Sequence, residues 1–215
     1  MLKVYGRRSA FNVQKVLWLI GELGLEHEHH DVGGAAGGLD APAFKAMNPH
    51  GRIPVIDDGG RVVWESHTIL RYLAARHARA PYWQDDAGLR ARAEGWMDWT
   101  LATLQPDFLR GVFWGFYRTP IDQRDMEAVN AKVAAVARHM AVMDDVLAGS
   151  RFLAGDRITL ADIAAGTAMY RYFNIDIARP DVPHVERWYR ELIVRHAYQQ
   201  HVMVRFDDLF GRLDY

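Results

Sequence analysis

The chain has 215 residues, of which 50% are hydrophobic and 25% are charged, and it contains no cysteine. These proportions are typical of a globular protein with a buried core and exclude a disordered chain. The 26 Lys and Arg residues against 27 Asp and Glu give a formal charge of −1, so no overall charge attracts nucleic acid or an anionic membrane. Without cysteine there is no disulfide, thiolate nucleophile or cysteine-bound metal, and any thiol chemistry must use a thiol from another molecule.

The start of the sequence shows no secretion signal, because residues 1–5 lead directly into a strand-like segment without a long apolar region. No apolar run reaches the length of a membrane span. Together with the lack of disulfides, these features predict a cytoplasmic protein that does not associate with a membrane.

Strand and helix patterns alternate in the first 76 residues. The elements that we expect, in chain order, are a strand over 2–5, a helix over 13–25, a strand over 26–32, a glycine-rich loop over 33–38, a helix over 41–47, a hairpin of strands over 53–56 and 61–64, and a helix over 68–76. This order predicts a compact α/β domain with the sequence βαβαββα.

Beyond residue 88 the strand patterns almost vanish. The apolar spacing there predicts helices over 89–116, 125–147, 160–173 and 185–193. The change of composition near residues 78–88 indicates a linker. We therefore expect two domains, residues 1–78 and residues 88–215, of which the second is all-helical.

Three segments resemble motifs of one family. They read NPHGRIPVI at 48–56, WESHTILRYL at 64–73 and TLADI at 159–163. Their order and spacing resemble those of the cytosolic glutathione transferases, whose corresponding first two segments read NPxGKVPxL and ES-xAI-xxYL. The resemblance covers nearly the whole chain. It implies a thioredoxin-like first domain that binds glutathione and a helical second domain for a hydrophobic co-substrate.

The pair Ile53-Pro54 stands at the start of a predicted strand. The resemblance implies a cis peptide bond here, which would leave the N–H and C=O of Ile53 available to pair with an extended peptide such as glutathione. The alternative is an ordinary proline on an edge strand.

Glu65 and Ser66 precede the helix predicted over 68–76, and Ser66 is a candidate N-cap. The unpaired N–H groups and the dipole at a helix N-terminus favour an anion. The resemblance implies that Ser66 binds the γ-glutamyl carboxylate of glutathione, that Glu65 binds its ammonium group, and that Arg52 binds the glycyl carboxylate. A plain helix cap and an exposed turn arginine are the alternatives.

The loop 6–12 leads into the first long helix and is the candidate catalytic loop. A free thiol titrates near pH ~8.5, and a hydrogen bond to sulfur at a helix N-terminus lowers that pKa. Ser9 resembles the serine of serine-type members, and Asn12 resembles the amide donor of some bacterial branches, similar to theta or nu members. The family's usual S-x-P-C-R run is not present. We predict Ser9 and Asn12 as catalytic residues, with Tyr5 as a weaker candidate and helix capping as the structural alternative.

The aromatic run 113–117 lies late in the helix predicted over 89–116. The resemblance implies that Phe113, Trp114 and Tyr117 bind the hydrophobic co-substrate, while packing in a core is an equal alternative. The resemblance also implies a homodimer.

Two further patterns have structural interpretations. Residues 159–162 predict a capping box with Asp162 in the place of Glu or Gln. The histidines at 27, 29 and 30 suggest a metal site, but no further ligands converge on them, so we expect no metal.

These features predict a detoxifying glutathione transferase, which would stabilise the glutathione thiolate for attack on an electrophilic small molecule. One alternative is a glutathione-dependent peroxidase or disulfide reductase that works through bound glutathione. The other is a binding protein with the same fold and no catalytic activity. The expected partners are glutathione, as co-substrate, and a hydrophobic electrophile.

Overall fold

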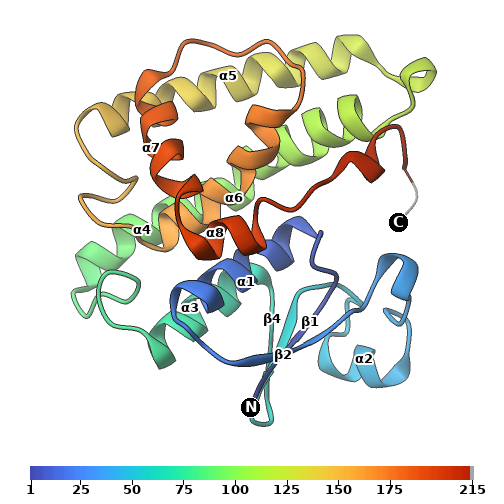
Figure 1. Ribbon diagram of the computed structural model, residues 1–215, viewed down its shortest axis with the longest axis vertical. Coiled ribbons are helices and arrows are strands. Elements are labelled where there is room, and N and C mark those ends of the chain that lie inside the picture. Colours follow the sequence, from blue (N-terminus) through green and yellow to red (C-terminus); the bar gives the residue numbers. More distant parts are fainter. Residues whose placement is uncertain (214–215) are drawn as a thin grey trace. The chain divides into compact units, whose positions relative to one another are not determined.

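The computed structural model describes residues 1–213, and the chain divides into two compact units (Figure 1). Unit 1 contains residues 1–79 and 196–204, and unit 2 contains residues 80–195 and 205–213. None of the helices in the described part of the chain combines the length and the apolar character needed to cross a membrane.

Unit 1 is built on a four-stranded mixed sheet with the strand order β2-β1-β3-β4. The strands are β1 (Leu2–Tyr5), β2 (His27–His30), β3 (Val55–Asp58) and β4 (Arg61–Trp64). The central strand β1 pairs in parallel with β2 and antiparallel with β3, and β3 and β4 form the expected hairpin. Because parallel neighbours need a crossover connection, a helix must join β1 to β2.

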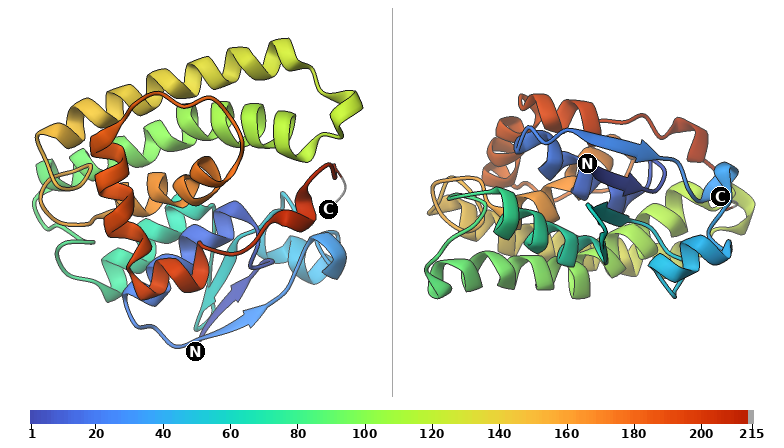
Figure 2. Two further views of the ribbon diagram at one scale, coloured as in Figure 1. Left: turned by 45° about the horizontal axis from the view of Figure 1, so that its top comes forward. Right: turned by 90° about the horizontal axis from the view of Figure 1, so that it is seen from below.

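That helix is α1 (Phe11–Glu22), which packs beside α3 (Ser66–His77) (Figures 1 and 2). Its residues from Val13 to Ile20 are all buried, as expected for a helix that is covered on every side. The short helix α2 (Pro42–Met47) lies between β2 and β3 in the chain. The strand and helix order of the first 76 residues is therefore the predicted one.

The helix α8 (His196–His201) belongs to unit 1, although it follows unit 2 in the chain. It packs on α1, where the ring centroids of Trp18 and Tyr198 are 4.7 Å apart. A Cβ on Gly21 would lie 2.8 Å from the Cβ of Ala197, so the glycine permits this close approach. The sequence patterns did not predict α8.

Unit 2 is helical. Its α-helices are α4 (Ala87–Trp99), α5 (Met126–Ala148), α6 (Leu160–Asn174) and α7 (Pro183–Ile193). The helix predicted over 89–116 is only partly an α-helix, because α4 continues into π-helical segments over Thr100–Leu104 and Pro106–Arg118. Pro106 has no N–H to donate to an α-helical ladder. At the far end, the Thr119 N–H donates to the Trp114 carbonyl, five residues back, at 3.0 Å.

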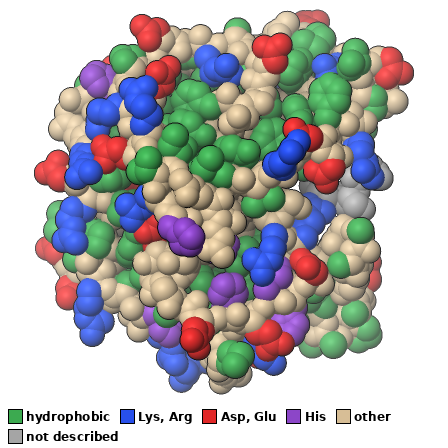
Figure 3. Space-filling view, viewed as in Figure 1, with side chains coloured by type: hydrophobic (Ala, Val, Ile, Leu, Met, Phe, Trp, Pro, Cys, Tyr) green, Lys and Arg blue, Asp and Glu red, His purple; other side chains and the backbone are tan. Residues whose placement is uncertain are grey.

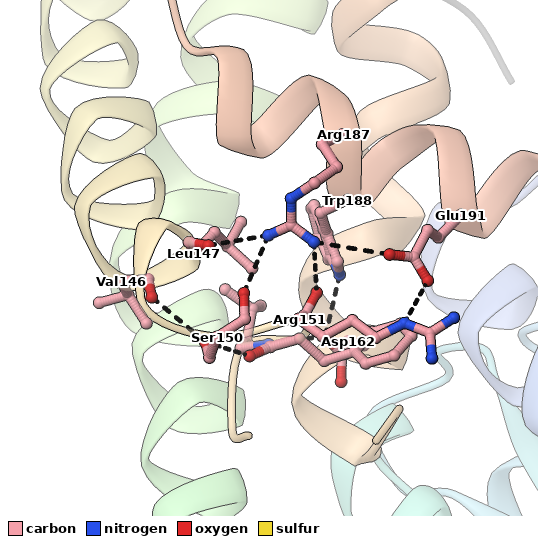
Figure 4. Close-up of polar contacts among 10 residues, drawn as sticks. Val146, Leu147, Ser150, Arg151, Asp162, Arg187, Trp188 and Glu191 are labelled. Carbon is pink, nitrogen blue, oxygen red and sulfur yellow. Dashed lines mark hydrogen bonds and ion pairs between the residues drawn. The ribbon is translucent and has the colours of Figure 1, made fainter. Parts of the chain in front are cut away.

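The start of α6 shows the predicted capping box, and Figure 4 shows how its Asp162 lies beside Trp188. Oδ2 of the buried Asp162 accepts hydrogen bonds from the Thr159 backbone at 2.8 Å and from its hydroxyl at 3.2 Å. Oδ1 accepts hydrogen bonds from the Leu153 N–H and from Nε1 of Trp188 on α7, both at 3.0 Å. Nearby, Arg187 donates to the carbonyls of Leu147 and Ser150 at the end of α5. Asp162 therefore joins α6, α7 and the preceding loop.

Candidate functional site in unit 1

The loop after β1 lies directly against the segment that contains the cis proline. Gly6, at φ 141°, makes this possible, because a Cβ there would lie 2.6 Å from Cγ2 of Val13 and 3.0 Å from Cβ of Ile53. The Gly6 N–H also donates to the His30 carbonyl at 2.9 Å. The fold thus brings the predicted catalytic loop and the predicted peptide-binding segment together, although about 50 residues separate them in the chain.

Ser9 and Asn12 stand at the start of α1, and both are half-buried. The N-cap of this helix is Ala10, and no side-chain cap is formed. Neither Ser9 nor Asn12 therefore occupies the N-cap position itself. Within residues 1–213, the buried Oδ1 of Asn12 has no hydrogen-bond partner. Tyr5, the weaker candidate, stacks on His30 with ring centroids 4.7 Å apart.

The Ile53–Pro54 bond is cis, as the resemblance implied. Among residues 1–213 no backbone hydrogen bond to the N–H or C=O of Ile53 is found. The buried Asn48 holds the segment before it, donating from Nδ2 to the Arg52 carbonyl at 2.8 Å and accepting from the His50 N–H at 3.1 Å. The Arg52 side chain is exposed. These contacts fix the backbone of the segment that leads into Ile53.

The turn before α3 differs from the expectation in one respect. Ser66 is not the N-cap but the first residue of the helix, and Glu65 takes the N-cap position with φ 69°. A non-glycine residue at positive φ is strained, and such residues gather at ligand-binding sites. The first turn leaves its N–H groups without helical partners, and the N–H of Ile69 is the first to pair, with the Glu65 carbonyl at 2.9 Å. This helix end suits an anion.

The aromatic residues predicted to bind the co-substrate lie in unit 2. Phe113 is 1% exposed and stacks on Tyr117 with ring centroids 5.3 Å apart. Tyr117 also contacts Phe206 and Phe210, and burial raises the pKa of its hydroxyl. Trp114 is half-buried beneath the Arg118 guanidinium. Phe113 thus packs in the core of unit 2, whereas Trp114 and Tyr117 are partly exposed to solvent.

Two of the three histidines of β2 pair with neighbouring carboxylates. His29 lies 3.2 Å from Asp31, and His30 lies 3.1 Å from Glu28. In the described part of the chain no group of three His, Asp or Glu residues is placed to hold a metal ion. Acidic and basic side chains are interspersed over the face shown in Figure 3.

Residues 12–76 match the family profile of the glutathione S-transferase N-terminal domain, and residues 97–195 match that of the glutathione S-transferase C-terminal domain. The chain is 36% identical over 206 residues to glutathione S-transferase GstB of Escherichia coli (strain K12), a match that covers 95% of this chain and 99% of that protein. It is 31% identical to glutathione S-transferase 3 of Zea mays, over 94% of this chain and 93% of that protein.

Solved structures agree with these matches. The theta class glutathione S-transferase of Xanthomonas axonopodis pv. citri, with glutathione bound, has a TM-score of 0.90 and 42% sequence identity over 95% of this chain and 98% of that one. A delta-class glutathione transferase of Nilaparvata lugens, at 22% identity, shares the fold with a TM-score of 0.82. The expected thioredoxin-like domain followed by a helical domain is confirmed, as is the similarity to theta members, and the chain belongs to the glutathione S-transferase family.

Proposed function

We propose that this glutathione S-transferase binds glutathione on unit 1 and activates its thiol as the thiolate, which attacks an electrophilic carbon. The observation that supports this most directly is the contact of the Gly6 loop with Ile53. Through this contact the loop that leads to Ser9 and Asn12 meets the segment whose backbone is expected to pair with the peptide.

Each part of glutathione has a matching group on unit 1. The N–H and C=O of Ile53 pair with the cysteinyl backbone as an added strand would. The N–H and hydroxyl of Ser66, at the N-terminus of α3, bind the γ-glutamyl carboxylate, and Glu65 binds the ammonium group beside it. The exposed guanidinium of Arg52 binds the glycyl carboxylate. These assignments are those that the motifs predicted.

The thiolate is stabilised by hydrogen bonds from Ser9 and Asn12. Among residues 1–213 the buried oxygen of the Asn12 amide has no partner, and rotation of the amide would exchange that oxygen for an N–H donor. A donor there favours the charged form of the sulfur and lowers its pKa. The thiol proton passes to solvent, the sulfur forms a bond to the carbon, and the leaving group departs with the bonding electrons.

The partly exposed Trp114 and Tyr117, and the buried Phe113 that stacks on Tyr117, stay our candidates for binding the hydrophobic co-substrate. A homodimer in the cytoplasm is the expected setting. Reduction of a peroxide or a small disulfide by bound glutathione is the alternative activity, and parallel assays with a hydroperoxide, a disulfide and a chlorinated aromatic compound distinguish it from conjugation.

The test compares Ser9→Ala, Asn12→Ala and the double variant with the wild-type protein. Calorimetry measures glutathione binding, and the ultraviolet absorbance of the thiolate as a function of pH measures the pKa of the bound thiol. We expect Asn12→Ala to raise that pKa by about 1 unit, equivalent to about 1.4 kcal/mol and a roughly tenfold loss of kcat/KM. Asn130→Ala, an exposed position on α5, is the matched control. A wild-type protein that binds no glutathione would refute the proposal, and unchanged thiol pKa values in all three variants would refute the roles of Ser9 and Asn12.

A further inference from the structure

The amine of Lys15 is buried inside unit 1. Lys15 lies on α1, one helical turn after Asn12, and its exposed fraction is 0%. Its Nζ is 3.0 Å from Nε2 of His67, which is itself 3% exposed. On the other side, Nζ is 4.9 Å from the centre of the Phe11 ring. A buried amine is unfavourable unless its surroundings compensate it, so its presence here requires a reason.

The contact joins the beginnings of two helices that both contribute to the proposed glutathione site. α1 begins at the loop that contains Ser9, and α3 begins with Ser66, the residue directly before His67. Glu65, on the other side of Ser66, has the strained φ of 69° and attracts Lys15 electrostatically. Strained backbone persists only where neighbouring contacts hold it.

The amine does not help the fold by being charged. Burial lowers the pKa of Lys15 to about 7, against the attraction of Glu65, which raises it. A folded state that disfavours the ammonium form gains no stability from it. An unbranched apolar side chain of similar length fills the same space without that penalty. The charge of the amine is therefore not what the fold gains from Lys15, and its contact with His67 is the feature to be explained.

We propose that Lys15 is a positioning residue for glutathione binding, which holds the Glu65–His67 turn in its binding geometry through His67. This inference rests on the proposed assignment of Glu65 and Ser66 to the γ-glutamyl group. Lys15 itself does not touch glutathione. Its contact with His67 fixes the first turn of α3 against α1, so that the anion-binding N–H groups are ordered before glutathione arrives.

The test uses the full-length chain and measures three quantities in each variant: the Kd for glutathione by calorimetry, the KM and kcat with an excess of a chlorinated aromatic substrate, and the melting temperature without ligand. For Lys15→Met we expect Kd and KM for glutathione to rise about tenfold, kcat to change less than about twofold, and the melting temperature to stay the same or rise. Lys3→Met, on β1, is the matched control and should leave all three unchanged.

Substitutions of His67 test the same contact from the other helix. His67→Leu removes the partner and should weaken glutathione binding as Lys15→Met does, whereas His67→Gln keeps an acceptor for the amine and should restore most of the affinity.

Unchanged Kd values in Lys15→Met and His67→Leu would overturn the inference while leaving the proposed function intact. A Lys15→Met protein that unfolds would also contradict it, because the argument requires that stability be retained. Failure of the wild-type protein to bind glutathione would instead overturn the proposed function.

Discussion

Asp162 allows a stability prediction worked directly from its contacts. The carboxylate is fully buried at the start of α6. It accepts four hydrogen bonds, from the Leu153 N–H, from the Thr159 N–H and hydroxyl, and from Nε1 of Trp188, the last of which Figure 4 shows. In Asp162→Ala, the Thr159 hydroxyl can turn to another acceptor, but three N–H donors lose their partner. Each buried donor left unpaired costs about 1–3 kcal/mol, and removing a buried charge offsets part of that loss.

We therefore expect Asp162→Ala to lower the free energy of unfolding by about 3–4 kcal/mol. Asp162→Asn keeps one carbonyl oxygen, which can serve the Leu153 and Trp188 donors, but turns an NH₂ group toward the donors of Thr159. Its expected loss is about 2 kcal/mol, mainly the capping box.

The assay is chemical denaturation followed by the fluorescence of tryptophan, supported by melting temperatures, in which 1 kcal/mol corresponds to about 2–4 °C for a chain of this size. Asp156→Asn, at an exposed position in the same loop, is the control and should change stability by less than about 0.5 kcal/mol. If both Asp162 variants unfold within about 1 kcal/mol of the wild type, the four contacts do not have the role assigned to them.

Two other positions give predictions of the same kind. Burial, and to a smaller extent the repulsion of nearby His and Arg side chains, lowers the pKa of His201 to about 4, below the ~6.5 of an unfolded chain. The neutral His201 therefore contributes to stability above pH ~6.5, and this contribution, about 2–3 kcal/mol, is lost as the pH falls toward 4. When melting temperature is plotted against pH, His201→Gln should reduce the fall between pH ~6.5 and 4, whereas His184→Gln should leave that fall unchanged. An equal fall in both variants would refute the assignment to His201. Gly6→Ala would bring a Cβ to 2.6 Å from a Val13 methyl group, at a φ that is unfavourable for alanine. In denaturation experiments it should lower the free energy of unfolding by about 2–4 kcal/mol, and it should also raise the KM for glutathione. Gly24→Ala, at φ +62° with open space around it, should cost only about 1 kcal/mol, and equal losses at both glycines would contradict the packing argument.

The sequence predicts best those elements whose local signals agree with their packing. The strand at 2–5 has the expected bounds, and α6 begins at Leu160 because the capping box specifies its start. The start of α3 was predicted two residues too late, because Ser66 has the composition of an N-cap while the observed cap, Glu65, adopts a left-handed φ. Nothing in a local pattern predicts that conformation, which depends on contacts of the turn with other parts of the unit.

The elements that were missed depend on packing more than on composition. α8 has six residues, too few to be stable alone, and lies in unit 1 because Tyr198 and Ala197 pack on α1. The π-helical turns after Trp99 were predicted as part of an α-helix, because the spacing of their apolar residues is also compatible with one. In both cases the local sequence permits several structures, and contacts with distant residues select one.

In the helix α1 the observed burial differs from the burial that the sequence pattern predicts. The apolar stripe from Val13 to Leu23 predicts an amphipathic helix and leaves Gln14 and Lys15 outside the stripe, yet both are buried, with exposed fractions of 1% and 0%. These buried polar residues stand in the first turns of α1, where Asn12 also has a buried oxygen without a partner among residues 1–213. The contact of Lys15 with His67 joins this end of α1 to the start of α3, so the departure from the apolar pattern falls where the two helices that the proposed site uses meet.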